Sequence, residues 1–149
     1  IWGGKTVSFL TRSISDNVDM KYIVCPKQRE IISLKTILYG KEEYWMEHKV
    51  GIIVEGVTDV WRLGPAAGAT LGIDFKMEQV LAITRRMEKV FILFDSEPQA
   101  QRQARLLQVK LRSLGKQAYI EQLEDGDPGE MKQDDADHLV RQLIGGHYE

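Results

Sequence analysis

The fold is decided by two short stretches, residues 51–59 (GIIVEGVTD) and residues 91–97 (FILFDSE). Each is an apolar run that ends in acidic residues. Continuous apolar runs of four or five residues predict strands that are covered on both faces, as in a parallel sheet. Ligands of open parallel sheets bind beyond the carboxyl ends of the strands. If the two strands are neighbours, Glu55, Asp95 and Glu97 meet in one cleft, and this all-oxygen setting suits a hard divalent cation such as Mg²⁺.

Strand and helix signals alternate through the rest of the chain. Further strands are predicted at residues 69–71 and 117–122. A short helix is predicted to end at Leu63, with Thr58 or Asp59 as its cap. Three longer helices are predicted over 75–87 after Asp74, from Pro98 to Gly115, and from Asp134 to Leu143. This order predicts an α/β fold with a mainly parallel four-stranded sheet flanked by helices.

The first third of the chain predicts a smaller unit that precedes this sheet. Residues 7–12 and 20–24 predict a β-hairpin, because a turn cluster separates them. Residues 34–47 show an apolar stripe that predicts a helix. Residues 3–6 (GGKT) are similar to the end of a phosphate-binding P-loop, but a Gly-Gly turn that enters a strand is the better interpretation, because no helix signal opens at Thr6.

Composition and charge narrow the class of protein. The chain has 149 residues, enough for one core and a small subdomain, and it has no apolar run near ~20 residues that could span a membrane. The single cysteine, Cys25, excludes an internal disulfide and fits a cytoplasmic setting. Residues 1–41 carry seven Lys/Arg and three acids, whereas residues 121–137 carry eight acids and one lysine. This asymmetry suits a protein that holds a polyanion and metal ions at different places, although ordinary surface variation explains it equally well.

The acidic motifs resemble those of the Toprim domain, which bacterial primases, type IA and type II topoisomerases and several recombination nucleases share. That family has a glutamate after its first strand and an Asp-x-Asp pair after a later one. The sequence VEGVTD at 54–59 is most similar to the E-G-x-x-D form of the primases. Similarities to DnaG-type primases continue along nearly the whole chain, with KTVSFLTR at 5–12, KYI at 21–23, KTILYG at 35–40, ATLG at 69–72 and LEDGDP at 123–128.

The resemblance implies a site for phosphoryl transfer that depends on Mg²⁺ or Mn²⁺. Its implied metal ligands are Glu55, Asp95 and Glu97, with support from Asp59 and Asp127. Glu55 is also the implied catalytic residue, which moves a proton for the reacting hydroxyl. Template and nucleotide contacts are implied for Arg12, Lys21 and Lys35, although most lysines and arginines are ordinary surface charges.

The sequence departs from the family pattern around the acidic residues. Glu97 stands where the family has a second aspartate, and Pro98-Gln99 replaces the usual Ala-Gly. The acidic loop is one residue short, and Gly129 stands where a further aspartate is frequent. These departures leave open a site that has lost its metal.

The resemblance implies a fragment of a DnaG-type primase core, with part of a basic N-terminal subdomain at 1–48 and a Toprim domain at 49–149. Such an enzyme joins ribonucleoside triphosphates into RNA primers on single-stranded DNA. A replicative helicase is an implied partner through regions outside this chain, and no membrane partner is expected. A Toprim nuclease and a non-enzymatic nucleic-acid-binding module remain the alternatives.

Overall fold

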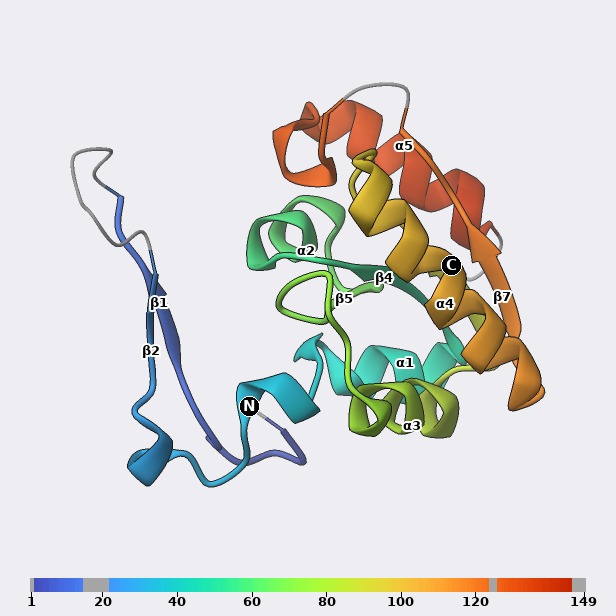
Figure 1. The fold of residues 1–149 in the computed structure, drawn as a ribbon. Coiled ribbons are helices and arrows are strands. Elements are labelled where there is room, and N and C mark those ends of the chain that lie inside the picture. The colour runs from blue at the N-terminus through green and yellow to red at the C-terminus, as the bar shows by residue number, and fades with distance from the viewer. Residues whose placement is uncertain (1, 15–21, 124–125, 146–149) are drawn as a thin grey trace.

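A five-stranded sheet lies at the centre of the larger part of the molecule (Figure 1). The computed structural model describes residues 2–14, 22–123 and 126–145. Across the sheet the order is β3 (Tyr39–Gly40), β5 (Ala67–Ala69), β4 (Val50–Val54), β6 (Lys89–Ile92) and β7 (Gln117–Ile120). The last four strands are parallel to one another, which confirms the predicted parallel sheet. The short strand β3 adds a fifth, antiparallel member at the edge.

Helices cover both faces of this sheet. One face packs against α3 (Met77–Arg86) and α4 (Pro98–Ser113), and the other packs against α2 (Val57–Leu63) and α5 (Gln133–Ile144). Side chains of β4 alternate between the two cores, so Ile53 joins the first, whereas Ile52 and Val54 join the second. A strand that is buried on both faces needs apolar residues at every position, which explains the continuous apolar runs.

The prediction of a helix over 34–47 is wrong for the first half of this segment. These residues form a 3₁₀ turn η2 (Leu34–Thr36), the strand β3 and then the helix α1 (Glu42–His48). Gly40 interrupts the helix with a positive φ of 150°, a conformation that glycine adopts most readily. The fully buried Trp45 then packs against Gly40 and Gly68, where an added Cβ would lie 2.6 Å from its ring.

The predicted hairpin is confirmed over its described residues. Strand β1 (Leu10–Arg12) pairs antiparallel with β2 (Tyr22–Val24), and the hairpin stands apart from the layered part in Figure 1. The 3₁₀ turn η1 (Lys27–Arg29) follows it. Near the start, Trp2 and Lys5 form a bridge across two glycines with positive φ. This is the expected Gly-Gly turn, and no helix follows it, so the P-loop alternative is wrong.

Several predicted boundaries shift by a few residues. Strand β5 begins two residues before the predicted position, and α3 begins after Lys76 instead of Asp74. At the end of α4, the guanidinium of Arg112 donates to the carbonyl of Ala118 at 2.9 Å. Within the described part of the chain, no helix has the length and apolar character needed to cross a membrane.

Candidate metal and nucleic-acid site

The acidic site lies at the carboxyl ends of two neighbouring strands. Strands β4 and β6 pair in parallel, with Ile53 opposite Ile92. Glu55 follows β4 and Asp95 follows β6, so both carboxylates emerge at the same edge. The backbone N–H of Asp95 donates a hydrogen bond to Oε1 of Glu55 at 3.0 Å. The structure therefore brings these two strand ends together, as the sequence predicted.

Asp59 belongs to the same edge but does not cap its helix as predicted. Gly56 occupies the cap position of α2, and Asp59 lies three residues later, where its Oδ2 accepts the backbone N–H of Gly56 at 2.8 Å. The side chain is buried, with 5% exposed. Asp59 therefore closes the turn between β4 and α2, and its second oxygen, Oδ1, lies beside Gly129.

Asp127 approaches the cluster from the loop before α5. It begins the 3₁₀ turn η3 (Pro128–Glu130), where its Oδ1 accepts the backbone N–H of Glu130 at 3.0 Å. A Cβ at Gly129 would lie only 3.0 Å from Oδ1 of Asp59 and 3.1 Å from Oδ1 of Asp127. The glycine that departs from the family pattern thus lets the loop come close to the acidic edge.

Arg62 ties this loop to the helix α2. Its Nε donates to the carbonyl of Gly129 at 3.4 Å, and its Nη1 donates to the side chain of Gln133 at 3.4 Å. Gln133 donates back to the carbonyl of Arg62 at 3.0 Å. Helix α2 thus positions Asp59 directly and holds the loop that carries Asp127.

Burial and crowding raise the pKa values of three carboxylates. Burial raises the pKa of Glu55 to about 7; the Asp95 N–H opposes the rise, and the charges of Asp95, Asp59 and Glu97 add to it. Burial likewise raises the pKa of Asp59 to about 6, with the Asp127 and Asp95 charges adding and hydrogen bonds from Gly56 and Gly129 opposing.

For Asp95, burial again raises the pKa, and the charges of Asp127, Glu97 and Glu130 add to it. The acidic side chains therefore destabilise one another when all are ionised and no cation is present.

The residues fit a hard divalent cation by their chemistry, although their side chains are not assembled as a finished ligand set. Among residues 2–14, 22–123 and 126–145, no three His, Cys, Asp or Glu side chains form a group that could hold a metal ion as they stand. The carboxylates of Glu55 and Asp59 instead accept backbone N–H groups. A divalent cation would bind the carboxylate oxygens and would offset the repulsion between their negative charges. Glu97, at the start of α4, is exposed.

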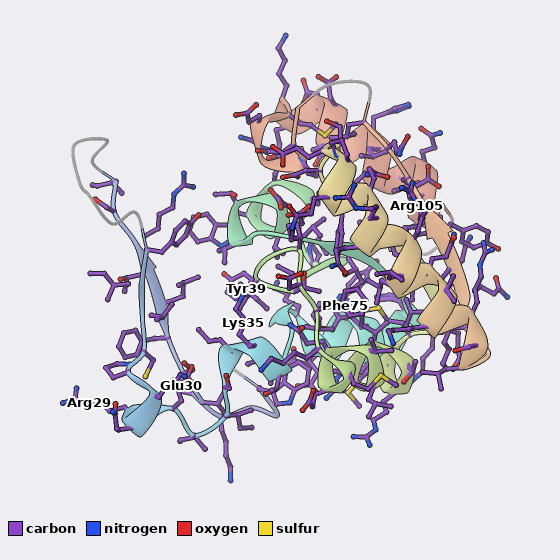
Figure 2. The ribbon with its side chains drawn as sticks, viewed as in Figure 1. Arg29, Glu30, Lys35, Tyr39, Phe75 and Arg105 are labelled. Carbon is purple, nitrogen blue, oxygen red and sulfur yellow. The ribbon has the colours of Figure 1, made fainter. Side chains whose placement is uncertain are left out.

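The predicted basic residues are divided between two adjoining cavities. Lys35 and Glu55 line one cavity of about 500 Å³, and the Lys35 ammonium donates to the carbonyl of Leu71. Arg12 lines the other, of about 650 Å³, with its guanidinium 5.6 Å from the centre of the Tyr22 ring. Lys21 lies outside the described residues. In Figure 2 Lys35 lies on the side of the layered part that faces the hairpin.

Sequence reasoning missed two residues that shape the site. The charge of Glu130 helps to raise the pKa of Asp95. The only sequence signal for this role is the position of Glu130 in the acidic segment 121–137. Gln101 is buried beside the stripe of α4 that packs on the sheet. Its amide donates to the carbonyls of Phe94 at 3.1 Å and Asp95 at 2.9 Å, so it fixes the turn after β6. A single glutamine beside an apolar stripe gives no such signal in the sequence.

Comparison with known proteins shows that the chain is similar to DNA primases. The chain is 28% identical over 148 residues to the DNA primase of Aquifex aeolicus, which covers 95% of this chain and 30% of that protein. It is similar to the crystal structure of the zinc-binding and RNA polymerase domains of the Aquifex aeolicus primase, with a TM-score of 0.78, 28% identity, and coverage of 95% of this chain and 37% of that one.

It is also similar to a DnaG primase catalytic domain described as bound to ssDNA, with a TM-score of 0.78, 20% identity, and coverage of 95% of this chain and 47% of that one. No protein-family model matches the chain.

The parallel sheet, its acidic edge and the small hairpin that precedes it match the fold of the primase RNA polymerase domain to which the chain is similar. The chain is a relative of the catalytic cores of bacterial DnaG-type primases and has their fold. It spans about a third of the length of the curated relative that it matches.

Proposed function

We propose that the protein that carries this chain is a primase-type nucleotidyltransferase that synthesises RNA primers on single-stranded DNA. The observation that carries the proposal is the meeting of Glu55 and Asp95 at the ends of two adjacent parallel strands, in a fold shared with primase catalytic cores. Ribonucleoside triphosphates are the substrates, and pyrophosphate is released.

Mg²⁺ or Mn²⁺ is the proposed cofactor, held by Glu55, Asp95 and Glu97 with support from Asp59 and Asp127. When bound, such an ion screens phosphate charge and steadies the attacking and leaving oxygens. The side chains supply what remains. Glu55 has a pKa of about 7, so near neutral pH it can accept the proton of the attacking sugar hydroxyl. The backbone N–H of Asp95 holds the carboxylate of Glu55 in place.

The basic side chains bind the anionic substrates. Lys35 lines the same cavity as Glu55, which supports the proposal that its ammonium contacts the phosphates of a nucleotide. Arg12 lies at the end of β1 in the neighbouring cavity, and Arg12 and Lys21 are proposed to hold the template strand. The separation of Arg12 from the carboxylates supports this division, because uncovered carboxylates repel phosphates.

The proposed division of the chain places part of a basic N-terminal subdomain at 1–48 and a Toprim domain at 49–149. The hairpin that stands apart in Figure 1 supports it. The strand β3 and the helix α1, from the end of the first segment, pack on the sheet of the second. The protein is proposed to act in the cytoplasm, and a helicase to bind it through regions outside this chain.

The product of one reaction tests the proposal. The whole protein that carries this chain is incubated with single-stranded DNA, labelled ribonucleotides and Mn²⁺, and the products are separated by size. The proposal expects new short RNA that is complementary to the template. Shortened DNA would identify a nuclease, and a mobility shift without a product would identify a binding module. Either of these results overturns the proposal.

A further inference from the structure

Trp61 is an exposed tryptophan that is held in a fixed orientation. Of the three tryptophans, Trp45 is fully buried, and the ring of Trp2 lies 4.2 Å from the guanidinium of Arg86. Trp61 projects from α2 and is 64% exposed. Its indole N–H donates to the hydroxyl of Tyr39 at 2.8 Å. The polar edge of the indole is therefore satisfied within the protein, whereas its surface remains open to solvent.

The indole lines the cavity of about 650 Å³ between the hairpin and α2. Tyr39 and Val57 lie on the same side as Trp61, while Arg12 and Tyr22 line the cavity from the hairpin. Val57 and Trp61 are four residues apart, so they share one face of α2 and lie about 6 Å apart along its axis. In Figure 2 Tyr39 points toward the hairpin side of the layered part.

This cavity adjoins the acidic site. Tyr22, Val57 and Leu71 line both this cavity and the neighbouring one of about 500 Å³, which reaches Glu55. Trp61 lines only the first cavity and Glu55 only the second. The two cavities thus form one groove, with the indole toward one end and the carboxylate toward the other.

The charges of the groove differ between its ends. Among the described residues, those that line the first cavity include the cations Arg12 and Lys41 and no Asp or Glu. The second cavity is lined by two lysines and two glutamates. An extended polyanion therefore finds a net positive charge beside Trp61 and a balanced charge toward Glu55. An apolar peptide would use the aromatic surface but would leave the two cations without a partner.

We propose that an unpaired base of a single-stranded DNA stacks on the exposed face of Trp61 while Arg12 and Lys41 bind its sugar–phosphate backbone. The inference rests on the proposed function and deepens it, because it names a subsite that holds the template beside the carboxylates. Aromatic side chains in a positive groove are the combination by which proteins bind single strands without reading their sequence. The hydrogen bond to Tyr39 fixes the indole before the strand arrives, which lowers the entropic cost of stacking.

Binding of a single-stranded oligonucleotide to the full chain tests this subsite. Titrations are made in EDTA without ribonucleotides, so they do not require polymerisation. Trp61→Ala is expected to weaken affinity by about 5- to 150-fold, since one stacked base contributes about 1–3 kcal/mol. Trp61→Phe should recover part of the loss. The slope of log K against log salt should stay unchanged, because no phosphate contact is removed.

Val109→Ala is the matched control, because Val109 is also 64% exposed but lies on α4. An oligonucleotide made only of abasic sites should bind the wild type and Trp61→Ala equally. Indole emission should fall on DNA binding in the wild type and much less in Trp61→Phe. If Trp61→Ala does not fold, the affinity of Trp61→Phe and the fall of indole emission still decide.

Equal affinity of the wild type and Trp61→Ala for the normal oligonucleotide would overturn the inference. The inference would also be overturned if Trp61→Ala lost affinity for ribonucleoside triphosphates but not for single-stranded DNA. That result would assign the stacked base to the incoming nucleotide. Primer synthesis that is unaffected in Trp61→Ala, together with unchanged DNA affinity, would leave the proposed function standing without this subsite. A wild type that binds DNA through Trp61 but makes no primer would overturn only the proposed function.

Discussion

Glu55→Gln should change how the stability of the protein depends on pH. The folded protein holds a proton on Glu55 up to a pKa of about 7, above the ordinary value of 4.5. Because the folded state binds this proton more tightly than the unfolded state, the stabilisation is complete below pH 4.5 and is lost as pH rises through about 7. The wild type without metal should therefore be less stable at pH 8 than at pH 5.

The magnitude follows from the size of the shift. A shift of about 2.5 units corresponds to about 3 kcal/mol at most. Roughly 2.5 kcal/mol of it falls between pH 5 and pH 8, and solvent screening of this partly exposed group reduces the expected change to about 1–2 kcal/mol. Glutamine keeps the Oε1 that accepts the Asp95 N–H and carries no charge. Glu55→Gln should thus lose less stability over this range, by that amount.

Urea denaturation at pH 5, 6, 7 and 8 in EDTA measures the effect. Glu47→Gln, at an exposed position on α1 outside the acidic cluster, is the control and should follow the wild-type profile. If wild type and Glu55→Gln lose equal stability between pH 5 and pH 8, the carboxylate is not buried against its acidic neighbours, and the reasoning fails.

Three further predictions follow from the site, the basic segment and the core. Mn²⁺ should raise the melting temperature of the wild type by native-state binding, and Asp95→Asn should abolish the rise; an unchanged rise would place the ion elsewhere. Lys21→Ala should flatten the salt dependence of single-stranded DNA binding by about 0.7 in log–log slope, whereas the control Arg105→Ala, on α4 (Figure 2), should not. Equal effects of the two substitutions would contradict DNA binding by the basic segment. Gly68→Ala should destabilise the fold by about 1–3 kcal/mol in urea denaturation, because its Cβ would meet the Trp45 ring at 2.6 Å; a neutral effect would show that the ring can move.

The sheet and the meeting of its acidic ends could be predicted because their causes are local. A strand buried on both faces must be apolar throughout, so the apolar runs 51–54 and 90–94 predicted the strands that the structure has at Val50–Val54 and Lys89–Ile92. The short strand β3 could not be predicted in this way, because two residues have no period. Its position depends on the distant strand β5, to which Tyr39 and Gly40 pair.

The arrangement of side chains at the site was less accessible to sequence reasoning. Motif spacing places Glu55 and Asp59 near one another, but it does not tell which oxygen accepts a backbone N–H. The bond from Arg62 to the carbonyl of Gly129 joins residues 67 positions apart, and neither residue belongs to a pattern that predicts it. Such contacts depend on tertiary packing, and only the folded chain reveals them.

Primer synthesis by Glu55→Gln tests the central claim most directly. The whole protein and this variant are compared on one single-stranded template with labelled ribonucleotides and Mn²⁺, at equal concentration and at a pH where both are folded. If Glu55 serves the reaction, the variant keeps its fold and its affinity for DNA, while the rate of primer formation falls at least about 100-fold, the usual size of a general acid–base contribution. Equal rates of primer formation in the two proteins would contradict the account.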